Sequence, residues 1–199
     1  MVVIDVSGVV LETERLVLRA FRLDDLDDFY EYASVAGVGE MAGWSYHKSK
    51  TESLEILNMF ISGKKEFAIV DKATVSAVHP RGKLIGSLGI NESVRTQADN
   101  KIYAGLIMRE LGFVLSKAYW GRGLIPEACR AVIEWLFSET NLDAITISHF
   151  IENAQSKRVI ARHSKYKILS VVCLRQAKGQ NFIHSRANEQ HNLEQYTHL

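Results

Sequence analysis

Residues 111–128 read LGFVLSKAYWGRGLIPEA, and this stretch decides the fold. Its opening, LGFVL, is an apolar run that predicts a buried strand, and its end has the apolar spacing of a helix. Gly121 and Gly123 lie in the turn between the two. Glycine tolerates positive φ and has no β-carbon, so consecutive N–H groups can converge there on one anion. The free N–H groups at the start of the helix add to this attraction, which predicts a pyrophosphate-binding turn.

The composition is that of an ordinary globular protein. The 199 residues are 47% hydrophobic and 24% charged, which fits one domain over residues 1–199 and argues against disorder. The net charge of +1 gives no general reason to bind nucleic acid or an anionic membrane. The sequence has neither a signal-peptide pattern nor an apolar run near the ~20 residues that span a bilayer. We expect a soluble, cytoplasmic protein whose recognition of anions is local.

The sequence contains no recognisable metal-binding or nucleophile motif. Cys129 and Cys173 lie in different segments without zinc-ligand spacing, which favours two free thiols. Three histidines recur every seven residues in the tail, at His184, His191 and His198. On a helix this spacing separates neighbours by about 10 Å, too far for them to share one ion. No Walker lysine follows the glycine turn. We therefore expect no bound metal.

Strand and helix patterns alternate along the chain. Strand patterns cover residues 16–20, 67–70, 84–90, 109–115, 143–150 and 168–174. Helical spacing covers residues 24–33, 51–60, 124–136 and 153–162. Asp24 and Asn153 are placed to cap the first and last of these helices. The order predicts a mixed α and β domain with one βαβ crossover, through the helix that begins at residue 124. A polar tail follows over residues 177–199.

Four sequence pieces follow one another in a characteristic order. They are ETERLVLR at 12–19, ELGFVL at 110–115, YWGRG at 119–123, and Glu152-Asn153 followed by Ser156, Arg158 and Val159. Together they resemble the GNAT superfamily of N-acetyltransferases, in particular its ribosomal-protein (Rim-type) branch. The resemblance implies an α+β acyl-CoA N-acyltransferase fold. Such a fold has a mixed, mostly antiparallel central sheet with splayed central strands and flanking helices, here over residues 11–176.

The resemblance also implies a reaction. An acetyl group would pass from acetyl-CoA to a primary amine, either a protein N-terminus or a small amine. The amine would attack the thioester directly, without a covalent acyl-enzyme and without a metal. The protein partners implied are the acceptor and, for a homodimer, a second copy of the chain.

Coenzyme-binding residues are implied at the positions that match the family motifs. The splayed strand would pair with the pantetheine arm through the main chain of Phe113, Val114 and Leu115. The pyrophosphate would meet the turn formed by Gly121, Arg122, Gly123, Leu124, Ile125 and Pro126. Asn153 would hydrogen-bond the pantetheine, and Arg158, with Arg130 and Lys157, would meet the 3′-phosphate.

Three residues are candidates for catalysis. The attacking amine has to be neutral, so a base is needed near neutral pH. Glu110, at the start of the splayed strand, is the first choice, because burial there would raise its pKa; a structural ion pair explains this residue equally well. His149, at the end of the next strand, titrates near neutrality or is a structural histidine. Ser156 would place a hydroxyl near the sulfur, or support the helix cap.

The sequence departs from the family pattern in its C-terminal third. Ile160 replaces the tyrosine that many GNAT enzymes use to protonate the leaving thiolate, although Tyr166 offers another phenol. A CoA-binding module with impaired catalysis is therefore an alternative, and a general nucleotide phosphate-binding domain is another. Residues Trp44, Tyr46 and His47 lie in a segment that borders the acceptor site in the family, or they belong to the core.

Overall fold

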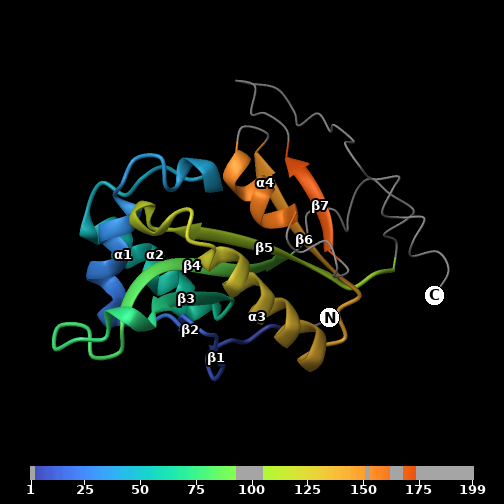
Figure 1. Ribbon diagram of the computed structural model, residues 1–199, viewed down its shortest axis with the longest axis horizontal. Coiled ribbons are helices and arrows are strands. Elements are labelled where there is room, and N and C mark those ends of the chain that lie inside the picture. The colour runs from blue at the N-terminus through green and yellow to red at the C-terminus, as the bar shows by residue number, and fades with distance from the viewer. Residues whose placement is uncertain (1–2, 93–104, 151–152, 162–167, 174–199) are drawn as a thin grey trace.

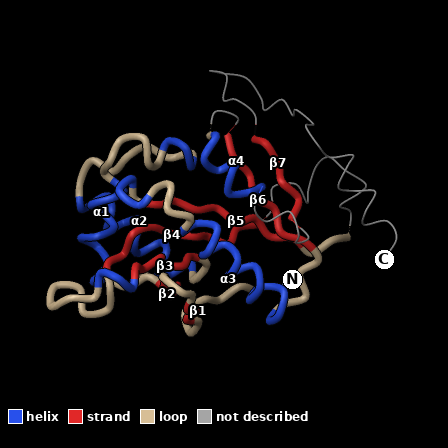
Figure 2. Tube along the Cα trace, in the orientation of Figure 1, coloured by secondary structure: helices blue, strands red, loops and turns tan. Residues whose placement is uncertain are grey.

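The computed structural model describes residues 3–92, 105–150, 153–161 and 168–173. They form one sheet with helices on both faces (Figure 1). The strands are β1 (Val10–Glu12), β2 (Leu16–Ala20), β3 (Glu66–Asp71), β4 (Lys83–Glu92), β5 (Met108–Leu115), β6 (Ala144–Phe150) and β7 (Ile168–Cys173). The helices are α1 (Leu26–Ala33), α2 (Lys50–Gly63), α3 (Leu124–Glu139) and α4 (Ala154–Ala161). Figure 2 shows how strands and helices alternate along the trace.

The strands lie in chain order across the sheet, from β1 to β7. Neighbours from β1 to β5 are antiparallel, whereas β5 and β6, and β6 and β7, are parallel. Parallel neighbours need a crossover, which α3 and α4 provide in turn. The predicted α+β fold with a mostly antiparallel sheet is confirmed, as is the crossover through α3. The second crossover and the three-residue β1 were not predicted.

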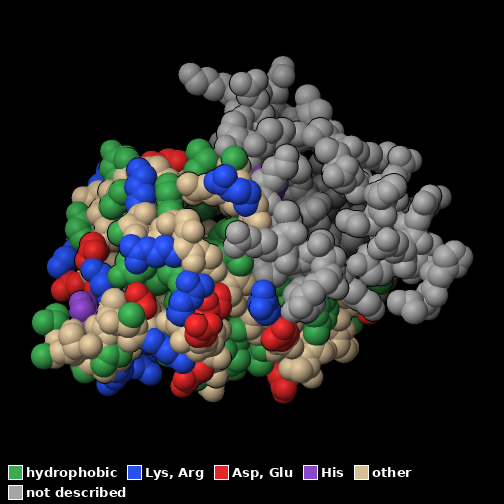
Figure 3. All heavy atoms as spheres, viewed as in Figure 1, with side chains coloured by type: hydrophobic (Ala, Val, Ile, Leu, Met, Phe, Trp, Pro, Cys, Tyr) green, Lys and Arg blue, Asp and Glu red, His purple; other side chains and the backbone are tan. Residues whose placement is uncertain are grey.

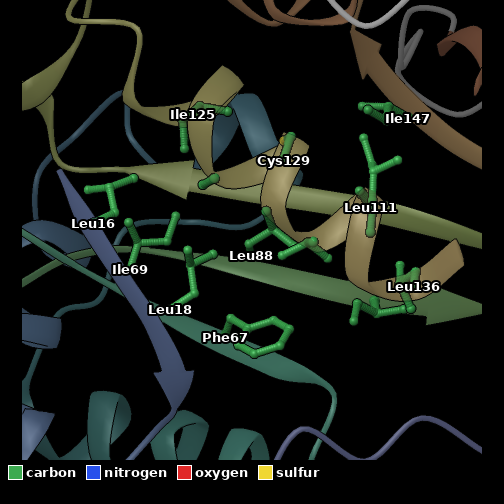
Figure 4. Close-up of a cluster of buried hydrophobic side chains, with 14 of the residues drawn as sticks. Leu16, Leu18, Phe67, Ile69, Leu88, Leu111, Ile125, Cys129, Leu136 and Ile147 are labelled. Carbon is green, nitrogen blue, oxygen red and sulfur yellow. The ribbon is translucent and has the colours of Figure 1, made fainter. Parts of the chain in front are cut away.

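The two faces of the sheet carry separate hydrophobic clusters. Successive residues of a strand point to opposite faces, so Phe67 in β3 packs under α3 while Ala68 packs under α1 and α2. We call these sides the α3 face and the α1–α2 face. Figure 4 shows part of the α3 cluster, including Leu16, Leu18, Phe67, Leu88, Leu111, Cys129 and Leu136. Each such buried side chain stabilises the fold by roughly 1.5–3 kcal/mol, which fixes α3 on the sheet.

The central strands diverge at one point. β5 and β6 pair over only four residues, from Met108 with Ala144 to Leu111 with Ile147. On its other side β5 remains paired with β4 up to Leu115. β6 remains paired with β7 up to its own end. Among the described residues, the edge of β5 toward β6 therefore has no strand partner from Gly112 onward, which confirms the predicted splay.

Some helix boundaries differ from the prediction. A short 3-10 turn over Leu23–Asp25 precedes α1, so Asp25 and not Asp24 is its N-cap residue. The carboxylate of Asp25 accepts the main-chain N–H of Arg22 at 2.8 Å and pairs with buried Arg19 at 2.6 Å. A charge pair that is buried in this way constrains the turn more than the local sequence does. The predicted tail, Tyr166 and the three tail histidines lie outside the described residues.

Candidate active site

The glycine turn has the predicted conformation. Gly121 and Gly123 have φ of 78° and 76°, and Gly123 is the N-cap residue of α3. In the described part of the chain, the main-chain N–H groups of residues 121–125 donate to no protein acceptor. Pro126 has no N–H, so this position of the predicted turn contributes only to its wall. Five unpaired donors at the start of a helix can hold an anion, so phosphate binding by this turn stays a prediction.

Two residues near the N-terminus, Thr13 and Arg15, hold this turn in place through Glu127. The Glu127 carboxylate accepts hydrogen bonds from Thr13 Oγ1 at 2.5 Å and from the main-chain N–H of Arg15 at 2.9 Å. The Arg15 side chain pairs with the same carboxylate and donates to the carbonyl of Arg122 at 2.9 Å. Burial acts to raise the pKa of Glu127, but these hydrogen bonds outweigh it and lower the pKa. Thr13 and Arg15 belong to the ETERLVLR piece of the family pattern, and their contact with the turn was not predicted.

Arg122 turns away from the anion site. Its guanidinium donates to the carbonyl of Ala118 at 2.8 Å and lies 5.0 Å from the centre of the Tyr119 ring. Basic side chains are nevertheless spread over the face that carries α3 and α4 (Figure 3). A phosphate contact by Arg122 stays a prediction, and it requires a different side-chain rotamer.

A cavity of about 300 Å³ lies between the glycine turn, the free edge of β5, α4 and the loop after α1. That volume is at the lower end of the range for small-molecule sites. Most of the predicted coenzyme residues line it: Phe113, Val114, Leu115, Gly121, Gly123, Leu124, Ile125, Pro126, Asn153 and Arg158. The loop after α1 also lines it, through Val38, Met41 and Ala42 and not through the predicted Trp44, Tyr46 and His47.

Asn153 joins α4 to the loop over the cavity. Its Oδ1 accepts the main-chain N–H of Ser156 at 3.0 Å, which confirms the predicted N-cap. Its Nδ2 donates to the carbonyl of Met41 at 3.3 Å. Ser156 and Asn153 both line the cavity. The hydrogen bond from Asn153 to pantetheine, and the role of the Ser156 hydroxyl, stay predictions.

The other two catalytic candidates, Glu110 and His149, lie on opposite faces of the sheet and outside the cavity lining. Glu110 is half-buried in the part of β5 that is paired on both sides, opposite Asn91 and Thr146. It shares a face with Val114, which is the α1–α2 face. His149 is buried on β6 and shares the α3 face with Ile147. Neither residue lines the cavity, so their catalytic roles stay predictions.

The ring side chains of the loop after α1 differ in burial. His47 is buried, with Nδ1 2.7 Å from the Ser53 hydroxyl and its ring against those of Phe29 and Trp44. Burial lowers the pKa of His47. Tyr46 is exposed. Packing of this kind gives Trp44 and His47 a structural role in supporting the loop.

Cys129 is a free thiol within the core, where burial raises its pKa to about 12. Among the described residues, no His, Cys, Asp and Glu side chains gather in threes as a metal site would require. No helix in the same part of the chain has the length and apolar character needed to cross a bilayer.

Comparison with known proteins identifies the fold. Residues 15–163 match the acetyltransferase (GNAT) domain. The chain is 26% identical over 155 residues to the "Uncharacterized N-acetyltransferase p20" of Bacillus licheniformis, covering 75% of this chain and 78% of that protein.

Solved structures of acetyltransferases have a similar fold. The GNAT-family acetyltransferase from Bacillus anthracis matches with a TM-score of 0.63 and 21% identity, over 77% of this chain and 81% of that one. A putative ribosomal-protein-serine acetyltransferase from Vibrio cholerae matches with a TM-score of 0.59 and 20% identity, over 78% and 82%. The chain therefore belongs to the GNAT family and is an acetyl-CoA-dependent N-acetyltransferase.

Proposed function

We propose that this N-acetyltransferase acetylates a primary amine, a protein N-terminus or a small amine, by direct attack on the thioester of acetyl-CoA. The observation that carries the proposal is the unpaired edge of β5, which leads from the glycine turn to the point where β5 and β6 close at Leu111. Such an edge offers main-chain donors and acceptors to an extended ligand, as it would to another strand. A long, amide-bearing arm with a diphosphate at one end fits this shape.

The coenzyme then has one orientation in the cavity. Its diphosphate binds the free N–H groups of residues 121–125, and its arm runs back along β5 from Leu115 to Phe113. The thioester lies near Gly112, because beyond this residue β5 and β6 are paired and leave no edge. Ser156 and Asn153 face the arm from α4.

The replacement of the usual tyrosine by Ile160 does not prevent the reaction. The pKa of a free thiol is only about 8.5, so a thiolate leaves readily at neutral pH without a strong acid. The step that needs help is loss of a proton from the acceptor, because an ammonium group has no lone pair for attack. Glu110 is one candidate for this base, named from the sequence.

Two observations, one from sequence and one from structure, support a peptide N-terminus as the acceptor. The order and spacing of the four sequence pieces favour the Rim-type branch, whose acceptors are ribosomal-protein N-termini. The Vibrio cholerae protein, described as a putative ribosomal-protein-serine acetyltransferase, shares the fold. A peptide N-terminus is therefore the first acceptor to test, with small amines second.

Release of free thiol from acetyl-CoA tests the proposal. The purified protein is incubated with acetyl-CoA and, in turn, short peptides with free N-termini, glycinamide and spermidine. We expect thiol release with at least one amine, and a product heavier by one acetyl group in mass spectrometry. Tight coenzyme binding in calorimetry with no thiol release for any amine would instead favour the CoA-binding module that has lost catalysis. Competition by ATP at the affinity of coenzyme A would favour a general nucleotide-binding domain.

A further inference from the structure

A row of three residues crosses the central strands on the α1–α2 face. Glu66 of β3 is paired with Gly89 of β4, and Gly89 is paired with Gly112 of β5. Directly opposed residues of antiparallel strands point to the same face. A β-carbon placed on Gly89 would collide with both carboxylate oxygens of Glu66. The Glu66 carboxyl group therefore lies over Gly89, one strand closer to β5 than its own backbone.

Open space continues this row at Gly112. Gly112 is exposed, and a β-carbon there would meet only Asn91 Nδ2, at 3.5 Å. It is also the first residue of β5 beyond the pairing with β6, where the thioester lies in the proposed complex. Adjacent strands are about 4.8 Å apart, so the Glu66 carboxyl group stands about 5 Å from the β5 backbone. A small group above Gly112 would contact both.

Glu66 has no partner to explain its position. Among the described residues it makes no hydrogen bond and no ion pair, although it is half-buried. Burial raises its pKa to about 7. An unpaired carboxylate in such surroundings is unfavourable. The position is more readily explained by a cationic group that binds there from outside the chain.

One phenol group lies near this carboxyl group. The Tyr32 hydroxyl from α1 is buried and makes no hydrogen bond within the described residues. Burial raises the pKa of Tyr32, the nearby Ser87 hydroxyl lowers it, and the charge of Glu66 raises it further. Ser87 is paired with Val114, which lines the cavity. The Tyr32 hydroxyl thus lies within electrostatic reach of Glu66.

The other charged groups on this side do not neutralise Glu66. The Arg19 guanidinium is fully engaged by Asp25, with contacts of 2.8 and 2.6 Å. Glu110 of β5 is acidic like Glu66, and it lies opposite Asn91, two pairs further into the closed part of the sheet. The side chains that α2 contributes to the cluster on this face are apolar, among them Leu57. A cation would therefore find Glu66 uncompensated.

We propose that Glu66 binds the ammonium group of the acceptor above Gly112 and takes its proton. This role rests on the proposed acetyl transfer. One proton passes from the ammonium nitrogen to Glu66, which frees the lone pair that forms the N–C bond. The C–S bond breaks, and sulfur leaves with its electron pair and receives the second proton lost by the nitrogen. Glu66 then returns its proton to solvent.

Kinetics across pH 5.5–9 test this role, with the fastest amine of the panel as acceptor. We expect Glu66→Gln to lower kcat/KM at pH 7 by at least thirtyfold and to abolish the ionisation near pH 7. The dissociation constant of acetyl-CoA should change by less than twofold. Glu55→Gln, on the exposed side of α2, is the matched control and should behave as the wild type.

Gly112→Val provides a second variant that does not alter the carboxyl group. The backbone at Gly112 is not among the glycines with positive φ, and the added side chain enters open space, so the fold should be retained. We expect the KM for the amine to rise at least tenfold. Thermal unfolding checks that both variants are folded.

The outcomes separate the two proposals. An active wild type with an equally active Glu66→Gln variant overturns the role of Glu66 and leaves acetyl transfer intact. Loss of the ionisation in Glu110→Gln but not in Glu66→Gln assigns the base to Glu110 and also overturns it. A wild type that binds acetyl-CoA but acetylates no amine refutes the proposed function, and the role of Glu66 with it.

Discussion

Arg15 and Glu127, 112 residues apart in the chain, form an ion pair of 2.6 Å that joins the start of β2 to the first turn of α3. Arg15 also binds the carbonyl of Arg122, within the glycine turn. The Arg15 side chain is 44% exposed, and a surface ion pair contributes only about 0–1 kcal/mol to stability. The ion pair therefore acts mainly by fixing the position of the glycine turn, and it adds little to the stability of the fold.

Arg15→Ala should weaken acetyl-CoA binding about threefold to tenfold, because the turn loses two of its anchors. The midpoint of thermal unfolding should change little. Isothermal titration calorimetry with coenzyme A measures the first effect. Lys50→Ala, which removes an exposed ion pair with Asp27, is the control and should leave affinity unchanged. Equal affinities for Arg15→Ala and wild type would contradict this role.

Gly123→Val should weaken coenzyme binding more than tenfold while the fold persists. A β-branched residue is strained at a φ of 76°, so the N–H groups of the turn lose their alignment. Gly8→Val is the control, because Gly8 has open space and no positive φ. Calorimetry and circular dichroism report on the two effects. Unchanged affinity would remove the phosphate-binding assignment of the turn.

The pKa of Glu66 predicts how stability depends on pH. The folded protein holds this proton more tightly than the unfolded chain, whose carboxyl group has a pKa near 4.5. The contribution of Glu66 to stability is therefore fully present below about pH 4.5 and is lost as the pH rises through about 7. The difference between these values corresponds to at most about 3 kcal/mol. Urea unfolding should find Glu66→Gln more stable than wild type at pH 8 and equal to it at pH 4. Equal stability at both values would contradict the burial of this charge.

Gly89→Ala and Gly112→Ala should differ, although the two glycines are directly paired. The new methyl group at position 89 collides with the Glu66 carboxyl group, whereas at position 112 it meets only Asn91 at 3.5 Å. We expect Gly89→Ala to destabilise the fold by about 1–3 kcal/mol and to lower kcat/KM as Glu66 is displaced. Gly112→Ala should be near wild type in stability. Thermal unfolding and acetyl transfer assays measure both, and equal effects of the two changes would argue against the geometry of the row.

Local features of this chain could be predicted because they depend on neighbouring residues. The conformation of Gly121 and Gly123 follows from the need for positive φ in a tight turn before a helix. The cap at Asn153 follows from its side-chain oxygen and the unpaired N–H groups after it. The crossover through α3 follows from the order of strand and helix patterns. At Asp24 the prediction was wrong by one residue, because Asp25 forms the buried ion pair with Arg19 and is the N-cap residue of the helix instead.

Sequence alone determined the family-specific turn, the strand and helix order, and most of the residues that line the cavity. Only the tertiary structure decided which side chains meet there. Glu110 and His149 lie on opposite faces of the sheet, and Glu66, which no motif singled out, stands next to Gly112. The physical reason is that strand register and face depend on pairing between distant segments. A shift of one residue in that pairing would turn every side chain of a strand to the other face.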